Sequence, residues 1–274
     1  MKMTKIWING KITSSMDTHI SVLDRGFTLA DGVFETMFFS HDEVEYYQYH
    51  MLRLRTACSE LYIACPLNDD IMLQGIIDLM NKNDLKSGAV RITISRGCSS
   101  RGLVIPDEMK PTVVITVASV QRIRPPAKIK ISSFTRNDTS PISHLKTLSY
   151  TNNIMALTEV SRHDEKCNEA LMLNTKGCVC CTSSGNVFLV FGNTLVTPDL
   201  GQGCLAGIMR SVVIQTAKKN KLTVLEQQIS LEDLKNADAV FITNSIVKIQ
   251  KVATVQDVYY DLSNAIVNFL EKSI

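Results

Sequence analysis

The sequence predicts an α+β fold divided into two domains, and three observations support this. The 274 residues, 45% of them hydrophobic, can fill one large core or two ordinary ones. Strand-like and helix-like stretches occur in groups rather than in strict βαβ alternation. Paired prolines at 125 and 126 favour an extended connector near the middle of the chain. We therefore expect domains at 1–121 and 131–274, joined by a linker at 122–130.

The first half contains strands at both ends and two helices between them. "KIWING" predicts a strand that ends in an Asn-Gly turn, and "GVFETMFFS" predicts a second strand rich in apolar residues. Leu54, Cys58 and Leu61 recur at helical spacing in residues 50–64, and "DDIMLQGIIDLMNKN" repeats that spacing after an Asp start. The β-branched runs "AVRITIS" and "PTVVITVAS" then return the chain to a sheet.

The second half repeats this mixture of strands and helices. "KIKISSF" predicts a strand, and the polar loop at 135–150 leads into a helix that ends near Arg162. Further expected elements are strands in "EALMLN" and "NVFLVF", a helix over 207–219, a strand over 239–244 and a C-terminal helix in "YDLSNAIVNFLEKS".

Charge and composition narrow the classes of protein. The net charge is +2, from 29 basic and 27 acidic residues mixed along the chain, which argues against a nucleic-acid or polybasic membrane surface. The sequence shows no signal peptide and no apolar stretch of the roughly 20 residues that a bilayer span needs. Eight cysteines without a secretory signal are typical of a reducing compartment. We therefore expect a cytoplasmic protein that binds neither nucleic acid nor membrane.

Cysteines are concentrated in "GCVCCTSSGN", which holds Cys178, Cys180 and Cys181. Together with His163 and Cys167 they are numerous enough for tetrahedral zinc, but zinc sites usually use C-x₂₋₄-C pairs. Small buried thiols that fill a strand are the favoured reading, and we expect no metal.

A phosphate site is the stronger lead. "GIMRSVVIQTA" begins a helix at Gly207, so the free N–H groups of Ile208 and Met209 can hold an anion at the positive end of the helix dipole. A glycine that only opens a helix is the alternative. Two other groups could also bind a phosphate, Arg53 and the residues Asn244 and Ser245. For Arg53 the alternative reading is an exposed helix arginine, and for Asn244 and Ser245 it is an ordinary turn at a strand end.

Seven segments in order resemble the class-IV (fold-type IV) aminotransferases, which use pyridoxal phosphate, and the resemblance spans nearly the whole chain. The segments are "DRGFTLADGVFET", "HMLRL", "SRGCSSRG", "LKTLSYTNNIMA", "EALMLNTKGCVCCTSSGNVF", "LAGIMR" and "FITNS". Each is weak alone, but seven in register are specific. The resemblance implies the two-domain α+β fold of the D-amino acid aminotransferases, with the cofactor in the cleft between the domains, in a homodimer whose partner loop helps to close the site.

The resemblance also implies roles for individual residues. Lys146 corresponds to the Schiff-base lysine, which anchors the cofactor and then moves the substrate α-proton; without the resemblance a surface lysine would be the better reading. Arg53 corresponds to the arginine that binds the cofactor phosphate as a charged fork. The expected phosphate ligands that join Arg53 are the amides of Ile208 and Met209 and the turn at Asn244 and Ser245. Met209 stands where the family usually has threonine, so one hydroxyl contact is lost.

Substrate contacts follow less directly. D-amino acid transaminases carry Arg-x-His after the "RG" strand end, whereas this chain reads Arg101-Gly102-Leu103. Arg101 is an expected carboxylate fork, with a loop arginine of no role as the alternative. Thr36 stands where 4-amino-4-deoxychorismate lyases carry a threonine that assists proton transfer, although a strand threonine is an equal reading. We expect the neighbouring Phe34 to contact the substrate.

Cys181 stands where the family has the glutamate that keeps the cofactor pyridine nitrogen protonated. A thiol with a pKa near ~8.5 keeps its own proton at neutral pH, whereas a carboxyl group with a pKa near ~4.3 is ionised and stabilises the protonated ring nitrogen. The ring nitrogen is therefore held in its protonated form less strongly here, which weakens the electron sink. The working hypothesis is therefore a lyase that converts 4-amino-4-deoxychorismate to 4-aminobenzoate and pyruvate, in the folate pathway. The alternatives are a transaminase of D-amino or branched-chain amino acids, and a non-catalytic family member.

Overall fold

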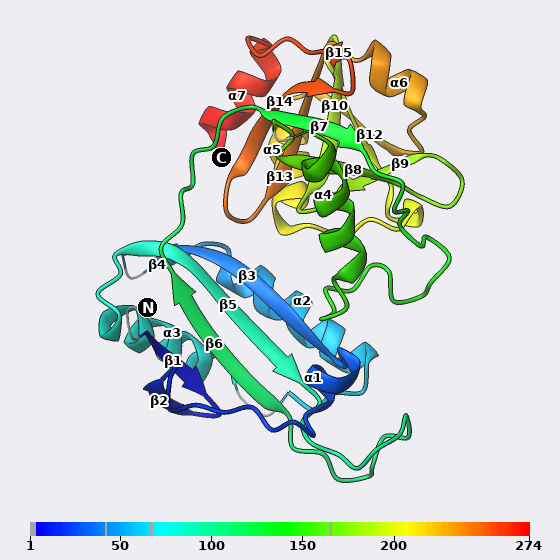
Figure 1. Cartoon of the computed structure of the whole chain (residues 1–274). Helices are drawn as coiled ribbons and strands as arrows, with labels where there is room; N and C mark the ends of the chain where they lie inside the picture. Colours follow the sequence, from blue (N-terminus) through cyan, green and yellow to red (C-terminus); the bar gives the residue numbers. More distant parts are fainter. Residues whose placement is uncertain (1–3, 42, 66–67, 165) are drawn as a thin grey trace. The chain divides into compact units, whose positions relative to one another are not determined.

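The computed structural model describes residues 4–41, 43–65, 68–164 and 166–274. The chain divides into two compact units. Unit 1 comprises Met1–Gln121 with Lys146–Ser149, and unit 2 comprises Arg122–Leu145 with Tyr150–Ile274. Each unit contains one β-sheet with helices packed on it (Figure 1). Among the described residues, no helix is both long and apolar enough to cross a membrane.

Unit 1 is built on an antiparallel sheet that contains six strands in the described part of the chain, in the order β2-β1-β6-β5-β3-β4. These strands are β1 (Lys5–Ile8), β2 (Lys11–Ser14), β3 (Gly32–Ser40), β4 (Glu43–Val44), β5 (Ser87–Ser95) and β6 (Thr112–Ala118). The predicted Asn-Gly turn is confirmed, because Asn9 and Gly10 both have positive φ, as a tight hairpin turn requires. Its second strand is β2, a short edge strand for which the sequence analysis made no prediction.

Three helices belong to unit 1: α1 (Arg25–Leu29), α2 (Tyr47–Glu60) and α3 (Asp69–Lys82). The two helices expected over 50–64 and 69–83 are therefore confirmed. The first of them, α2, begins three residues earlier than predicted. The Asn68 side chain accepts from the Ile71 N–H and caps α3. Helices α2 and α3 lie against the same face of the sheet (Figure 1), where Trp7, Ile92 and Ile115 are buried.

This packing gives the two faces of the unit 1 sheet different roles. Trp7 pairs with Ile115, Ile115 with Ile92, and Ile92 with Glu35, so these four side chains share the helix-covered face. Strand alternation then places Phe34 and Thr36 on the opposite face of β3.

Unit 2 contains a mixed sheet of nine strands in the described part of the chain, in the order β12-β11-β10-β13-β14-β7-β8-β9, with β15 paired to β14. The strands are β7 (Ala127–Ile131), β8 (Glu169–Leu173), β9 (Val179–Thr182), β10 (Asn186–Phe191), β11 (Thr194–Pro198), β12 (Thr223–Gln227), β13 (Ala239–Asn244), β14 (Lys248–Val255) and β15 (Val258–Tyr259). The helices are α4 (Thr151–His163), the 3₁₀ turn η1 (Leu200–Gln202), α5 (Ile208–Lys219), α6 (Leu231–Asn236) and α7 (Ala265–Ser273).

Each helix that the sequence predicted in this half is present. Helix α5 packs on β13 through Val213 and Ile214, which meet Phe241 in one apolar cluster. Phe188 of β10 stacks on Phe241 with ring centroids 4.9 Å apart. The side of β13 that carries Phe241 therefore faces α5.

The unit boundaries differ from the expected domains in two places. Strand β7 begins at Ala127, directly after the proline pair, so the expected linker at 122–130 contains strand residues that pair with β14 and β8. Residues 146–149, expected in the second domain, belong to unit 1 because they pair with β3. Both differences arise from strand pairings between segments that lie far apart in the sequence.

Candidate functional site

Lys146 lies beside the start of β3. Its carbonyl accepts from the Phe34 N–H at 3.0 Å, the Leu148 N–H donates to the Gly32 carbonyl at 2.9 Å, and Thr147 forms a bridge with Val33. These bonds fix the backbone of the lysine against the strand. The half-buried side chain brings Nζ to 4.2 Å from the centroid of the Phe34 ring.

Phe34 and Thr36, two of the predicted site residues, share the face of β3 over which this lysine lies. Arg91 of β5 is opposite Thr36, and its guanidinium carbon is 3.7 Å from the Phe34 ring centroid. The sequence analysis did not single out Arg91. A signal was present, because a charged residue in "AVRITIS" has to point away from the apolar face. The structure thus brings Lys146, Phe34, Thr36 and Arg91 together in unit 1.

Arg53, the predicted phosphate fork, forms a buried ion pair on the other face of β3. Its Nε donates to Glu35 Oε1 at 2.7 Å and its Nη2 donates to Oε2 at 2.8 Å. His50, one helical turn before Arg53 on α2, places Nδ1 2.7 Å from the same Oε2. Burial alone would raise the pKa of Glu35, but the bonds and charges of His50 and Arg53 outweigh it and lower that pKa to about 2. Glu35 is therefore ionised and orients the arginine.

Arg101 lies in the irregular segment that follows β5, and its side chain is exposed. Neighbouring residues in that segment accept hydrogen bonds from Arg25, a buried residue of α1. Arg101 therefore has a constrained backbone, although it is not on the face of β3 that carries Lys146.

In unit 2, the predicted helix start is confirmed: Gly207 is the N-cap of α5, and Ile208 and Met209 are its first residues. A Cβ at Gly207 would lie 2.0 Å from the side-chain oxygen of Asn186, so only glycine fits this contact. The Asn186 amide nitrogen donates to the Leu205 carbonyl at 2.8 Å. The start of α5 is thus held against the start of β10.

Asn244 and Ser245 lie in the turn between β13 and β14. The Asn244 side-chain oxygen accepts from the N–H groups of Ile246 and Val247, at 3.0 and 3.1 Å, and so stabilises that turn. Asn244 thus serves as a turn residue, the alternative left open above, and its side-chain oxygen, an acceptor, is not a group that would bind a phosphate anion.

Thr243, one residue earlier, is a candidate that the sequence analysis missed. It pairs with Asn186 and, like Phe241, points to the α5 side of the sheet. Its hydroxyl is buried and has no hydrogen-bond partner among the described residues. A buried hydroxyl without a partner is costly, so this group, close to the start of α5, is suited to a bound anion.

Cys181 is buried in an apolar cluster that contains three other thiols, those of Cys167, Cys180 and Cys204. The neighbouring Cys180 thiol lowers the pKa of Cys181, and the neighbouring Cys181 raises the pKa of Cys180. The nearby Arg136 guanidinium also favours the Cys181 thiolate, whereas burial and the Glu169 carboxylate oppose it. Cys181 is therefore the more acidic thiol of the adjacent pair.

All eight cysteines lie among the described residues and are free thiols. Within those same residues, no three His, Cys, Asp or Glu side chains are placed to hold a metal ion, so His163 and the cysteines do not assemble into a zinc site there. Cys178 and Cys180 are both buried, as expected of filler, but only Cys180 lies in strand β9, and Cys178 directly precedes it.

Glu169 is a third group, after Arg91 and Thr243, that was not predicted from the sequence. This carboxyl at the start of β8 is buried, and the hydroxyls of Ser183 and Ser184 donate to its two oxygens. Burial raises its pKa more than the two hydroxyls lower it. A buried glutamate beside the "CTSSGN" turn thus lies close to the position where the family carboxylate is absent.

Comparison with known proteins identifies the family. The model of the class IV aminotransferases matches residues 32–255. The chain belongs to this family. It is 31% identical over 259 residues to the aminodeoxychorismate lyase of Bacillus subtilis, covering 93% of this chain and 88% of that protein. It is 30% identical over 252 residues to a putative branched-chain-amino-acid aminotransferase of Methanocaldococcus jannaschii, covering 90% of this chain and 86% of that protein.

Solved structures agree with this assignment. A 4-amino-4-deoxychorismate lyase from Pseudomonas aeruginosa superimposes with a TM-score of 0.86 at 25% identity, covering 98% of this chain and 97% of that chain. The branched-chain amino acid aminotransferase of Escherichia coli gives 0.90 at 25% identity, with coverages of 99% and 93%. The family and α+β fold expected from the sequence are confirmed, as are the expectations of an enzyme and of pyridoxal phosphate as its cofactor.

Proposed function

We propose that this class IV enzyme is a lyase that converts 4-amino-4-deoxychorismate to 4-aminobenzoate and pyruvate. The observation that carries the proposal is the shared face of β3, where Lys146 Nζ lies 4.2 Å from the Phe34 ring and Thr36 follows two residues later. A lysine and a hydroxyl on one face are suited to removing one proton and delivering another.

Each unit by itself contains groups that suit the cofactor. The start of α5 offers the amides of Ile208 and Met209, and the unpaired Thr243 hydroxyl is suited to replace the hydroxyl that Met209 lacks. In unit 1, Arg53 is pre-oriented by Glu35, and Lys146 supplies the amine for covalent attachment. When bound, pyridoxal phosphate supplies an electron sink for the carbon that carries the substrate amine.

Lys146 then acts as the base. Its amine lies 4.2 Å from the centroid of the Phe34 ring, and the Arg91 guanidinium carbon lies 3.7 Å from the same centroid. Lys146 removes the proton from the amine-bearing carbon of the substrate. The carbon–oxygen bond to the enolpyruvyl group breaks, the ring becomes aromatic, and the Thr36 hydroxyl delivers a proton to the departing group, which leaves as pyruvate.

Cys181 supports elimination over transamination. A thiol ordinarily ionises less readily than a carboxyl group, so it is a weaker partner for a protonated pyridine nitrogen and weakens the electron sink, and the lowered pKa of Cys181 reduces this difference. An elimination driven by aromatisation tolerates that weakness better than a transamination does. The absence of a histidine at position 103, where Leu103 stands, and the 31% identity to the B. subtilis lyase support the same choice.

The deciding experiment incubates the purified protein, loaded with pyridoxal phosphate, with 4-amino-4-deoxychorismate. We expect 4-aminobenzoate and pyruvate in equal amounts, and no 4-aminobenzoate from Lys146→Ala. If 4-aminobenzoate does not form with the wild type, the proposal is wrong.

Transamination is the second candidate, because relatives include D-alanine aminotransferases, 27% identical in Listeria innocua, as well as the branched-chain enzymes. Turnover of D-alanine or L-leucine with 2-oxoglutarate, in the absence of lyase activity, supports it. A non-catalytic protein is the third candidate. A visible cofactor absorbance that disappears in Lys146→Ala excludes that reading.

We further propose a cytoplasmic homodimer that acts in folate synthesis. Eight free thiols suit a reducing compartment. Large apolar side chains are exposed on and beside α1 and in the segment after β5, including Val22, Leu23, Phe27, Leu103 and Val104. Such a surface is suited to a second copy of the chain. Light scattering of the purified protein that gives the monomer mass would contradict the dimer.

A further inference from the structure

The segment that carries Arg101 is fastened to α1 along its backbone. The Arg25 N–H donates to the Gly97 carbonyl at 2.9 Å, and the Ser99 N–H donates to the Leu23 carbonyl at 3.3 Å. Between these bonds, Asp24 and Cys98 form an antiparallel bridge. The first residues of the segment therefore have a fixed position relative to the helix.

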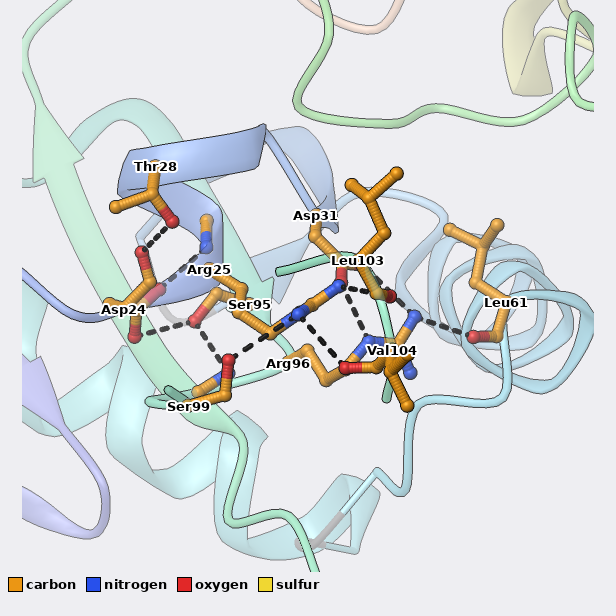
Figure 2. Close-up of polar contacts among 12 residues, drawn as sticks. Asp24, Arg25, Thr28, Asp31, Leu61, Ser95, Arg96, Ser99, Leu103 and Val104 are labelled. Carbon is orange, nitrogen blue, oxygen red and sulfur yellow. Dashed lines mark hydrogen bonds and ion pairs between the residues drawn. The ribbon is translucent and has the colours of Figure 1, made fainter. Parts of the chain in front are cut away.

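The guanidinium of Arg25 continues this attachment through the rest of the segment (Figure 2). Its Nη1 donates to Ser99 Oγ at 3.3 Å, to the Gly102 carbonyl at 3.0 Å and to the Val104 carbonyl at 3.5 Å, and its Nη2 donates to the Leu103 carbonyl at 3.3 Å. Three successive carbonyls thus converge on one buried cation. Only the planar fork of an arginine offers donors in enough directions for this arrangement.

Asp31 holds that cation in place. Its Oδ2 accepts from Arg25 Nε at 2.8 Å and from Arg96 Nε at 2.7 Å, and its Oδ1 accepts from Arg96 Nη2 at 2.9 Å. Burial raises the pKa of Asp31, but the two arginines outweigh it and hold that pKa below its ordinary value. Arg96 is itself fixed by the carbonyls of Leu61 and Tyr62. The carboxylate and both guanidiniums therefore form one rigid cluster.

The cluster determines which groups of the segment face outward. Because the carbonyls of residues 102–104 turn inward to Arg25, the side chains of Leu103 and Val104 are 79% and 86% exposed, and Arg101 is exposed beside them. Gly102 has a φ of +123°, a conformation that other residues rarely adopt. Arg25 thus holds the chain on both sides of Arg101, through Ser99 before it and Gly102 after it.

We propose that Arg25 is a positioning residue for substrate specificity: it holds residues 99–104 so that Arg101 is presented to a carboxylate of the substrate. This inference rests on the proposed lyase function and on the expected role of Arg101 as a fork for a substrate carboxylate. The holding of the segment by Arg25 is independent of the reaction and can be tested separately.

Limited proteolysis tests directly whether Arg25 holds residues 99–104. Trypsin cleaves after Arg101 only when this segment detaches locally from the rest of unit 1. Hydrogen bonds from a charged donor are each worth about 1.5–3 kcal/mol, so Arg25→Gln should raise the rate of cleavage between Arg101 and Gly102 by about tenfold or more. Arg25→Lys keeps the charge beside Asp31 but cannot reach three carbonyls. We expect Arg25→Lys to give a smaller increase in the rate of cleavage after Arg101. If Arg25→Gln does not fold, Arg25→Lys is used in its place.

Arg55→Gln is the matched control. It removes an arginine–carboxylate pair from the same unit, the pair with Asp69, without touching the segment. Its rate of cleavage after Arg101 should equal that of the wild type. Cleavage after Arg101 that is unchanged in both Arg25 variants, with folding verified by the fluorescence of Trp7, overturns the proposal.

Steady-state kinetics test the consequence for the substrate. Arg25→Gln should raise KM for 4-amino-4-deoxychorismate about tenfold with kcat changed less than about threefold, and Arg101→Ala should do the same. A KM that rises in Arg101→Ala but not in Arg25→Gln overturns the proposal. If the wild-type protein shows no turnover, the proposed function has failed, and the rate of cleavage after Arg101 still decides whether Arg25 holds the segment.

Discussion

The Glu35 carboxylate holds the Arg53 guanidinium in a two-point ion pair, with N–O distances of 2.7 and 2.8 Å, inside unit 1. The pair joins β3 to α2, and only 1% of the glutamate side chain is exposed. Arg53 is therefore oriented by the same strand that carries Phe34 and Thr36 on its other face. One strand thus fixes both the arginine and the opposite sheet face.

Replacing Glu35 by Gln should destabilise unit 1, because the half-buried Arg53 and the buried His50 lose their anionic partner. Breaking a buried pair costs about 3–5 kcal/mol, and we expect a loss of this order at pH 7. Urea unfolding monitored by Trp7, the one tryptophan in the sequence and a residue of unit 1, measures it. Asp69→Asn breaks the more exposed Arg55 pair and should cost less than about 1 kcal/mol. Equal losses in the two variants would contradict the importance of the Glu35 pair.

The same carboxylate predicts a dependence of stability on pH. The pKa of Glu35 is about 2 in the folded chain against an ordinary value of 4.5, so its stabilising effect is complete above pH 4.5 and is lost as pH falls towards 2. That difference corresponds to about 3 kcal/mol. Urea midpoints of unit 1 between pH 5 and 2.5 should fall more steeply for the wild type than for Glu35→Gln. Parallel profiles would show that Glu35 does not carry this effect.

Elements that depend only on neighbouring residues could be predicted from local patterns in the sequence. The Asn-Gly turn, the helix spacing of α2 and α3 and the glycine start of α5 are all present as expected. Strand β2 escaped prediction because it is short and lies at the sheet edge, where no apolar alternation is required.

The contacts of the site depend on pairings that the sequence does not display. Lys146 joins unit 1 only because its backbone pairs with β3, more than 100 residues away in the sequence. His50 and Arg53 lie three residues apart on one helix face, but their shared partner Glu35 follows from the packing of α2 on β3. The resemblance to the family supplied the role of Lys146, whereas Arg91, Thr243 and Glu169 required the structure.

Thr36→Val tests proton transfer at the substrate face. The change keeps the shape of the side chain and removes its hydroxyl, so kcat for 4-aminobenzoate formation should fall by about 100-fold while cofactor absorbance is retained. Thr116→Val, on the same face of the sheet and also paired with Arg91, is the matched control and should leave kcat unchanged. A Thr36→Val enzyme with wild-type kcat would mean that the hydroxyl has no part in the reaction.

Cys181→Glu tests the position of the electron sink. Restoring the carboxylate should raise the pKa of the cofactor ring nitrogen, shift the visible absorbance, and increase any transaminase rate relative to the lyase rate. Cys178→Ser changes a buried cysteine outside the Cys181 cluster and should leave the spectrum as it is. Identical spectra and rates in Cys181→Glu and the wild type would show that residue 181 does not contact the ring.

Thr243→Val separates binding from stability at the start of α5. The Thr243 hydroxyl is buried with no partner among the described residues, so removing it should leave the cofactor-free protein equally stable or more stable, by up to about 1 kcal/mol. The same change should weaken pyridoxal phosphate binding by about three- to tenfold, because a phosphate oxygen loses a donor.

Thr197→Val supplies the opposite pattern and so makes the test decisive. Thr197 is equally buried in unit 2, but its hydroxyl donates to the Val187 carbonyl at 2.8 Å. Its replacement should cost about 1–2 kcal/mol of stability, because the Val187 carbonyl loses its donor, and should leave cofactor affinity unchanged. Urea unfolding of the cofactor-free proteins and fluorescence titration with pyridoxal phosphate measure the two quantities. If Thr243→Val also loses stability and keeps its affinity, the hydroxyl has a structural partner and the phosphate is held elsewhere.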